Sequence, residues 1–172
     1  TSVGGDTLQI EVNVMPGKGV LQMTGQMGDV MKESAQIALT YVRSVASDYG
    51  VKENYFEKHD IHLHIPEGAV PKDGPSAGIT MATAMLSAVT GRKVLPRVAM
   101  TGEVTLRGHV LMIGGLKEKL LAARMAQVEK VLVPAKNQPD VEELSKEITK
   151  GMEIVYIKEM NEVIREAFVP EK

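Results

Sequence analysis

The chain has 172 residues, a formal net charge of −2 and no cysteine. This length suits one domain with a sizeable core, and the lack of cysteine excludes thiol catalysis, zinc–thiolate sites and disulfide bonds. Without a basic surplus, and with only 3% aromatic residues, no nucleic-acid partner is expected. No apolar run reaches the roughly 20 residues of a membrane helix.

The N-terminal half is expected to combine strands with one long helix. Residues 8–15 alternate apolar and polar side chains, which predicts a half-buried strand. Residues 20–24 are expected to form a second strand, paired with the first in a hairpin across Pro16 and Gly17. Apolar spacing of three and four predicts a helix over 29–48 that ends at Gly50, and alternation predicts a strand over 60–66.

The C-terminal half alternates strands and helices. Residues 75–90 are almost wholly apolar, which is typical of a helix buried between layers. Further elements are expected as a strand over 98–101, a hairpin over 103–113, helices over 116–127, 140–149 and 161–168, and strands over 131–133 and 154–157. This order predicts parallel pairing here and antiparallel pairing in the N-terminal half. The whole chain is therefore predicted to be one mixed α+β domain over 1–172.

Ser76 lies in the stretch PKDGPSAG, between a predicted strand and the apolar helix. A phosphate-binding loop would need Gly, four residues and Gly-Lys-Ser/Thr, and the chain contains no such string. Two interpretations stay open. Ser76 is a helix cap, or it is a nucleophile whose oxyanion would be stabilised by the N–H of Ser76 itself or of a neighbour such as Ala77.

A nucleophilic serine requires a base. The spacing of the four histidines selects none of them for a Ser-His-Asp triad. Lys117 and Lys119 lie in GGLKEKL, at the start of a helix that is otherwise rich in Leu, Ala and Met. Burial disfavours a charged lysine and would make it a proton acceptor, although a solvated lysine is the ordinary alternative on a helix surface.

Several motifs occur together in a characteristic order: MPGKGVLQMTGQMGDVMKES, YFEKHDIHLHIPEGAVPKDGPSAG, MTGEVTLRG, IGGLKEKL and VLVPAKN. They resemble the proteolytic domain of Lon proteases (endopeptidase La) of the bacterial and mitochondrial A type. The resemblance extends from about Leu8 to Asn137. One departure is Met112, where the family usually has proline.

The resemblance implies a Ser-Lys dyad. Ser76 would be the nucleophile and Lys119, rather than Lys117, its base. Thr101, in MTGE, would bond the lysine amine and orient it. For Asp73 we hypothesise that its carboxylate pairs with Lys119 in an inactive loop state and turns away in an active one; the alternative is an Asx turn or a residue that begins the helix.

Three further polar residues are expected near the site. His62 and His64 share one face of the strand over 60–66, which we expect to border the active groove rather than to bind metal. Glu11 corresponds to an acidic residue near the site in the family, and a solvated surface position is the alternative. No metal or cofactor is expected in this chain.

The implied function is that of a serine endopeptidase within an ATP-dependent protease that degrades unfolded, damaged and regulatory proteins. The fold would be that of the Lon proteolytic domain, which a domain of a ribosomal protein also adopts. ATP and magnesium would belong to a covalently linked ATPase module, since the chain has no Walker A motif. The full-length protein would be a cytoplasmic bacterial hexamer with polypeptide substrates. The alternatives are a noncatalytic assembly or binding module of the same scaffold, and an esterase or amidase without an ATPase.

Overall fold

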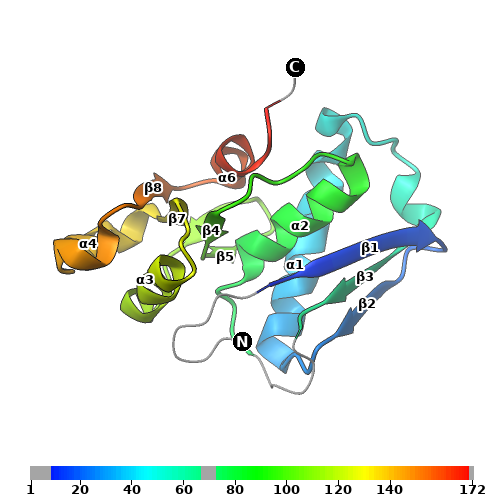
Figure 1. The fold of residues 1–172 in the computed structure, drawn as a ribbon. Coiled ribbons are helices and arrows are strands. Elements are labelled where there is room, and N and C mark those ends of the chain that lie inside the picture. The colour runs from blue at the N-terminus through cyan, green and yellow to red at the C-terminus, as the bar shows by residue number, and fades with distance from the viewer. Residues whose placement is uncertain (1–8, 67–72, 171–172) are drawn as a thin grey trace.

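We describe residues 9–66 and 73–170 from a computed structural model (Figure 1). The N-terminal half builds a three-stranded sheet from β1 (Glu11–Pro16), β2 (Leu21–Thr24) and β3 (His59–His64). The strand order is β1-β3-β2, with β1 antiparallel and β2 parallel to the central β3. The antiparallel pairing predicted for this half therefore holds for β1 and is wrong for β2. Ile61 and Leu63 of β3 are buried, whereas His62 and His64 are partly exposed on the other face, as alternation predicts.

The predicted hairpin between the first two strands is wrong, because β3 lies between them. Asp60, the second residue of β3, gives the reason. One of its carboxylate oxygens accepts hydrogen bonds from the backbone N–H groups of Lys18, Gly19 and Val20, at 2.8, 3.0 and 2.9 Å. The chain that leaves β1 is thereby held over the end of β3, and β2 then runs along the far edge of β3.

Two helices, α1 (Asp29–Val45) and α2 (Gly78–Thr90), cover one face of this sheet (Figure 1). The short 3-10 helices η1 (Ala46–Tyr49) and η2 (Tyr55–Glu57) join α1 to β3. In α2 the side chains of Ile79, Met81 and Met85 are fully buried, which confirms the prediction of a helix between layers. The larger hydrophobic core lies between these helices and the sheet.

The C-terminal half is built on a parallel sheet of order β4-β7-β8, as predicted. Its strands are β4 (Val98–Met100), β7 (Lys130–Pro134) and β8 (Glu153–Ile157). The predicted hairpin is formed by β5 (Glu103–Val104) and β6 (Val110–Leu111). Helix α3 (Leu116–Met125) packs on this sheet around a second, smaller core, and α6 (Met160–Ala167) closes the fold against α2.

One predicted helix in this half is wrong. Residues 140–149 do not form a continuous helix but two short ones, α4 (Gln138–Glu142) and α5 (Lys146–Thr149). The Ser145 hydroxyl caps α5 by accepting a hydrogen bond from the N–H of Glu147, which begins a new helix where the predicted one would continue.

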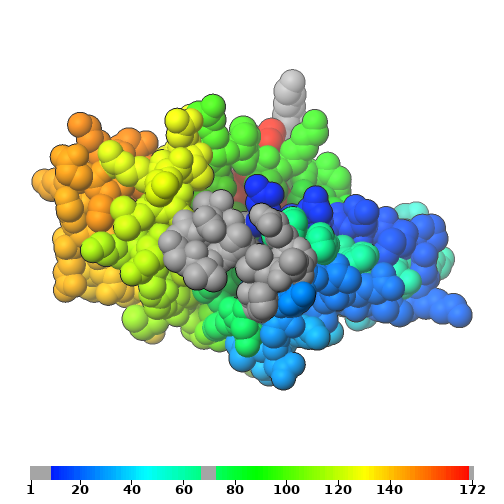
Figure 2. Space-filling model, turned by 60° about the horizontal axis from the view of Figure 1, so that its bottom comes forward, coloured from blue at the N-terminus to red at the C-terminus, as the bar shows by residue number. Residues whose placement is uncertain are grey.

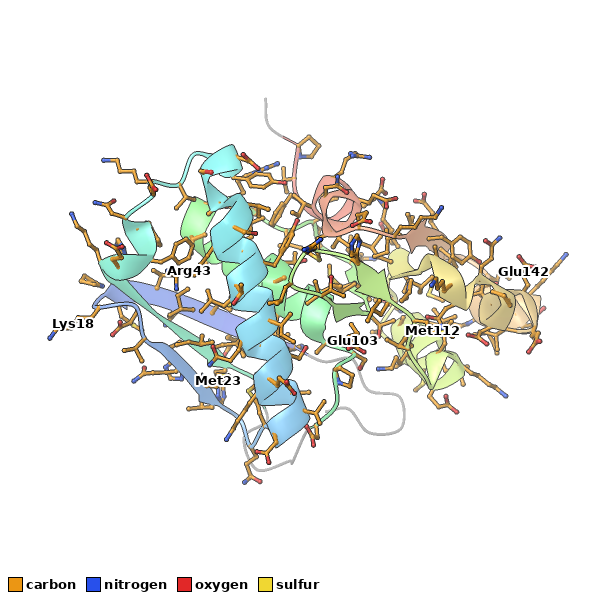
Figure 3. All side chains as sticks on the ribbon, turned by 180° about the vertical axis from the view of Figure 1, so that it is seen from behind. Lys18, Met23, Arg43, Glu103, Met112 and Glu142 are labelled. Carbon is orange, nitrogen blue, oxygen red and sulfur yellow. The ribbon has the colours of Figure 1, made fainter. Side chains whose placement is uncertain are left out.

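Figures 2 and 3 show that the two halves lie side by side. In Figure 3, Lys18 marks one end of the molecule and Glu142 the other, with Glu103 and Met112 between them. Across residues 9–66 and 73–170, no helix has the length and apolar character needed to span a membrane.

Candidate active site

Ser76 and Lys119 meet between the two halves of the fold. The amine Nζ of Lys119 donates a hydrogen bond of 2.8 Å to the hydroxyl Oγ of Ser76, across 43 positions of sequence. Ser76 lies just before α2, on the side of the larger core, and Lys119 lies in the first turns of α3, on the side of the smaller core. Tertiary structure thus joins the two residues that the sequence motifs single out.

Ser76 does not cap α2. The N-cap position belongs to Ala77, which makes no side-chain capping hydrogen bond, so the helix-cap interpretation of Ser76 is wrong. The turn is held instead through the carbonyl oxygen of Ser76, which accepts hydrogen bonds from Gly102 N at 2.8 Å and from Thr101 Oγ1 at 3.4 Å. Its hydroxyl is left for Lys119.

Thr101 makes a different hydrogen bond from the one expected. Its buried hydroxyl donates to the backbone of Ser76, whereas the resemblance implied a bond to the lysine amine. Its N–H donates to the carbonyl oxygen of Leu132 in β7, at 3.1 Å. Thr101 therefore links the turn that contains Ser76 to the central strand of the C-terminal sheet.

Lys119 is partly buried, whereas Lys117 is exposed. Burial lowers the pKa of the Lys119 amine from its ordinary value, since removal from water disfavours the charged form. A neutral amine has a lone pair that can accept a proton, so burial prepares Lys119, and not Lys117, to act as a base.

The carboxylate of Asp73 is bound at the N-terminus of α1. One of its oxygens accepts a hydrogen bond of 3.0 Å from the N–H of Met31. The N-cap residue of this helix, Gly28, provides no capping side chain, so Asp73 supplies the acceptor from 42 positions away. Hydrogen bonds from backbone N–H groups lower the pKa of Asp73, and the bond from Met31 contributes most. Asp73 is thus turned toward α1.

Comparison with known proteins identifies the family of this chain. A family model described as the Lon protease (S16) C-terminal proteolytic domain matches residues 1–170. The chain belongs to this family. It is 68% identical over 169 residues to the Lon protease of Lachnoclostridium phytofermentans, an alignment that covers 98% of this chain and 21% of that protein. To Lon protease 1 of Bacillus subtilis it is 55% identical over 172 residues, covering 100% of this chain and 22% of that protein.

The resemblance to Lon proteases is thereby confirmed, and the chain is a Lon proteolytic domain. It spans about a fifth of the length of these two relatives.

His62 and His64 are held together by a third residue of the same sheet. The hydroxyl of Thr24, on β2, lies 2.9 Å from His62 Nε2 and 2.7 Å from His64 Nδ1. Glu11 is exposed and lies opposite His64 in the strand register. Throughout the described part of this Lon domain, no three His, Cys, Asp or Glu side chains form a group that could hold a metal ion.

Two N–H groups are candidate oxyanion donors. In the part of the chain that the structure describes, no hydrogen-bond acceptor is assigned to the N–H of Ser76 or to that of Ala77. Both precede the first turn of α2, where the helix dipole favours negative charge.

Sequence reasoning missed two glycines that shape the site. A side chain at Gly28 would overlap the Asp73 carboxyl, because an added Cβ would lie only 2.3 Å from Cγ of Asp73. Gly102 supplies the 2.8 Å hydrogen bond to the carbonyl oxygen of Ser76. Both glycines stand in motifs that carry the family resemblance, but their contacts are with residues distant in sequence, so no local pattern could assign them a role.

Proposed function

We propose that this domain is a serine endopeptidase in which Ser76 is the nucleophile and Lys119 its general base. The observation that carries the proposal is the 2.8 Å hydrogen bond between Lys119 Nζ and Ser76 Oγ. Burial supports it further, because it lowers the pKa of the amine. A base within hydrogen-bond reach of the nucleophile, in a protonation state that can accept a proton, is what acyl transfer by a serine requires.

The proposed reaction has two halves. Neutral Lys119 takes the proton of the Ser76 hydroxyl while Oγ bonds to the carbonyl carbon of the peptide. The N–H groups of Ser76 and Ala77 stabilise the oxyanion, and the lysine then gives its proton to the leaving amine as the C–N bond breaks. Water, deprotonated by Lys119, hydrolyses the ester in the second half and regenerates Ser76.

Asp73 bears on whether Lys119 can act. A carboxylate beside the amine would favour its charged form and prevent proton uptake. With Asp73 bound to the N–H of Met31, this carboxylate is engaged at α1. We propose that this position corresponds to the active arrangement, and that pairing of Asp73 with Lys119 would be the inactive one.

The second part of the proposed function concerns ATP. Since the domain spans about a fifth of its relatives, we propose that it works in a hexamer with a linked ATPase module that binds ATP and magnesium and delivers unfolded, damaged or regulatory proteins. On this view the domain alone cleaves small or unfolded peptides and leaves stably folded proteins intact. Rapid digestion of a folded protein without ATP would contradict this.

Substitution of each dyad residue tests the catalytic proposal. Ser76→Ala and Lys119→Met should each lower kcat/KM for an unfolded peptide by about 10⁴-fold or more, since groups that act as a unit fail together. A fluorophosphonate should label the wild-type domain at Ser76, and Lys117→Met should keep wild-type kinetics. Retention of hydrolysis by Ser76→Ala would refute the mechanism, and absence of both hydrolysis and labelling in the wild type would favour a noncatalytic module.

A further inference from the structure

Asn137 is a fully buried polar residue at the end of η3 (Ala135–Asn137), directly after β7. Its side-chain oxygen accepts a hydrogen bond from Ile113 N, and its amide nitrogen donates to Ile113 O, both at 2.9 Å. The same nitrogen donates to a carboxylate oxygen of Asp140 at 2.7 Å. The amide therefore pairs with both backbone groups of Ile113, as a residue of a neighbouring strand would.

Ile113, which Asn137 holds, lies three positions before the helix that carries Lys119. It is followed by Gly114 and Gly115, of which Gly115 has a φ of 68° and precedes the first residue of α3. The N–H of Lys119 then donates to the carbonyl oxygen of Gly115 at 3.3 Å. Since two successive glycines restrict the backbone least, the start of α3 depends on how firmly Ile113 is held.

The nucleophile is tied to the same part of the sheet. Leu132, in the middle of β7, accepts a hydrogen bond from Thr101 N at 3.1 Å, and the Thr101 hydroxyl donates to Ser76 O. Asn137 lies five positions after Leu132 and holds the segment that leads to Lys119. One strand and the turn that follows it thus connect to both members of the dyad.

We propose that Asn137 is a positioning residue for Lys119, which fixes the start of α3 through Ile113 and so brings the amine within reach of Ser76. The catalytic consequence rests on the proposed function of the dyad. Among similarly sized side chains only an amide can do this. Aspartate lacks the donor for Ile113 O, and leucine lacks both partners.

The first test is Asn137→Ala in this chain, with Val163→Ala as the control. Val163 is fully buried on α6, in the larger core, so its truncation destabilises the fold without touching Ile113. A displacement of the amine on the order of 1 Å costs about 100-fold in rate. For Asn137→Ala we expect kcat to fall about 100-fold, with little change in KM. For Val163→Ala, compared under conditions of equal thermal stability, we expect kcat to fall less than about 10-fold.

A second readout does not depend on activity. The titration of Lys119 can be followed by NMR with ¹³C-labelled lysine, assigned by comparison with Lys119→Met. Asn137→Ala should move the titration midpoint to higher pH, because an amine that leaves its place beside Ser76 is better hydrated. Val163→Ala should leave the midpoint in place.

Asp140→Ala provides a milder variant if Asn137→Ala does not fold. Asp140 is exposed, and its removal frees only one of the three hydrogen bonds, so we expect a loss on the order of 10-fold in kcat and a midpoint shift in the same direction. An unshifted Lys119 titration in the folded variants would overturn the role of Asn137. If Ser76→Ala or Lys119→Met remained active while the titration still shifted, the proposed function would fail and the positioning role would stand.

Discussion

Gly78 is the first residue of α2, two positions after Ser76, and we predict that Gly78→Ala damages both stability and activity. A Cβ built at this position would lie 3.0 Å from three atoms: Ser34 Oγ, Val104 Cγ1 and the backbone nitrogen of Val104. An ordinary contact would be about 3.4 Å or more. Because one of the three atoms is backbone, it cannot move aside as the end of a flexible side chain could.

The size of the effect follows from two opposing contributions. Alanine is favoured over glycine in a helix interior by about 1 kcal/mol, and by less at the first helical position. Overpacking of a well-packed site costs about 1–3 kcal/mol. Overpacking is the larger contribution, so we expect the free energy of unfolding to fall by about 1–2 kcal/mol. This corresponds to a fall in Tm of about 2–8 °C for a domain of this size.

Gly114→Ala is the matched control, because an added Cβ would meet nothing within 4 Å there. At such a position, alanine reduces the freedom of the unfolded chain and is expected to stabilise by about 0.4–1 kcal/mol. Urea unfolding and peptide hydrolysis would be measured for both variants. If Gly78→Ala were as stable as Gly114→Ala and had wild-type kcat/KM, the reasoning from close packing behind Ser76 would be refuted.

Three further predictions concern charged groups. Gly28→Ala and Asp73→Ala should each lower kcat/KM, since each removes the hydrogen bond between the Asp73 carboxyl and Met31. The methyl group added at Gly28 acts only by displacing this carboxyl, so the double variant should have the same kcat/KM as Asp73→Ala. Additive losses in kcat/KM would contradict this. Lys119→Met should be inactive but more stable than wild type at neutral pH, since burial lowers the pKa of Lys119. Below about pH 10.4, Lys119 binds more protons in the unfolded state than in the folded state. In urea titrations, the stability of the wild type relative to Lys119→Met should therefore increase as pH rises toward that value. Asp60→Asn should lower Tm at neutral pH, because hydrogen bonds from Val20, Lys18 and Gly19 lower the pKa of Asp60; the difference should disappear in acid, once the carboxyl is protonated in both states.

Local patterns predicted most of the elements of this fold. Alternation located the buried face of β3, and the apolar run located α2, because both periodicities follow from burial of one face or of a whole element. The pairing of β2 escaped prediction. It depends on Asp60, whose three hydrogen bonds reach back about 40 positions to the turn after β1, and no local pattern records such a contact.

At the site, too, some features could be predicted from the sequence and others depend on contacts between distant residues. The motifs singled out Ser76 and Lys119, and the structure places their functional atoms 2.8 Å apart. The supporting contacts were not predictable. Asp73 reaches the N-terminus of a helix 42 positions earlier, and Asn137 reaches a backbone segment 24 positions earlier. Each uses an ordinary side chain whose function depends only on what the fold brings beside it.

The position of β7 explains how Ser76 and Lys119 can be held close together although they lie on the sides of two different cores. Leu132 belongs to the larger core, whereas its neighbours Val131 and Val133 belong to the smaller one, because successive side chains of a strand point to opposite faces. The same strand is bonded to Thr101 on the side of Ser76 and leads into Asn137 on the side of Lys119. A movement of either core relative to the other would therefore have to distort β7, which is paired with strands along both edges. Close packing on both faces resists that distortion, so β7 helps to fix the separation of amine and hydroxyl.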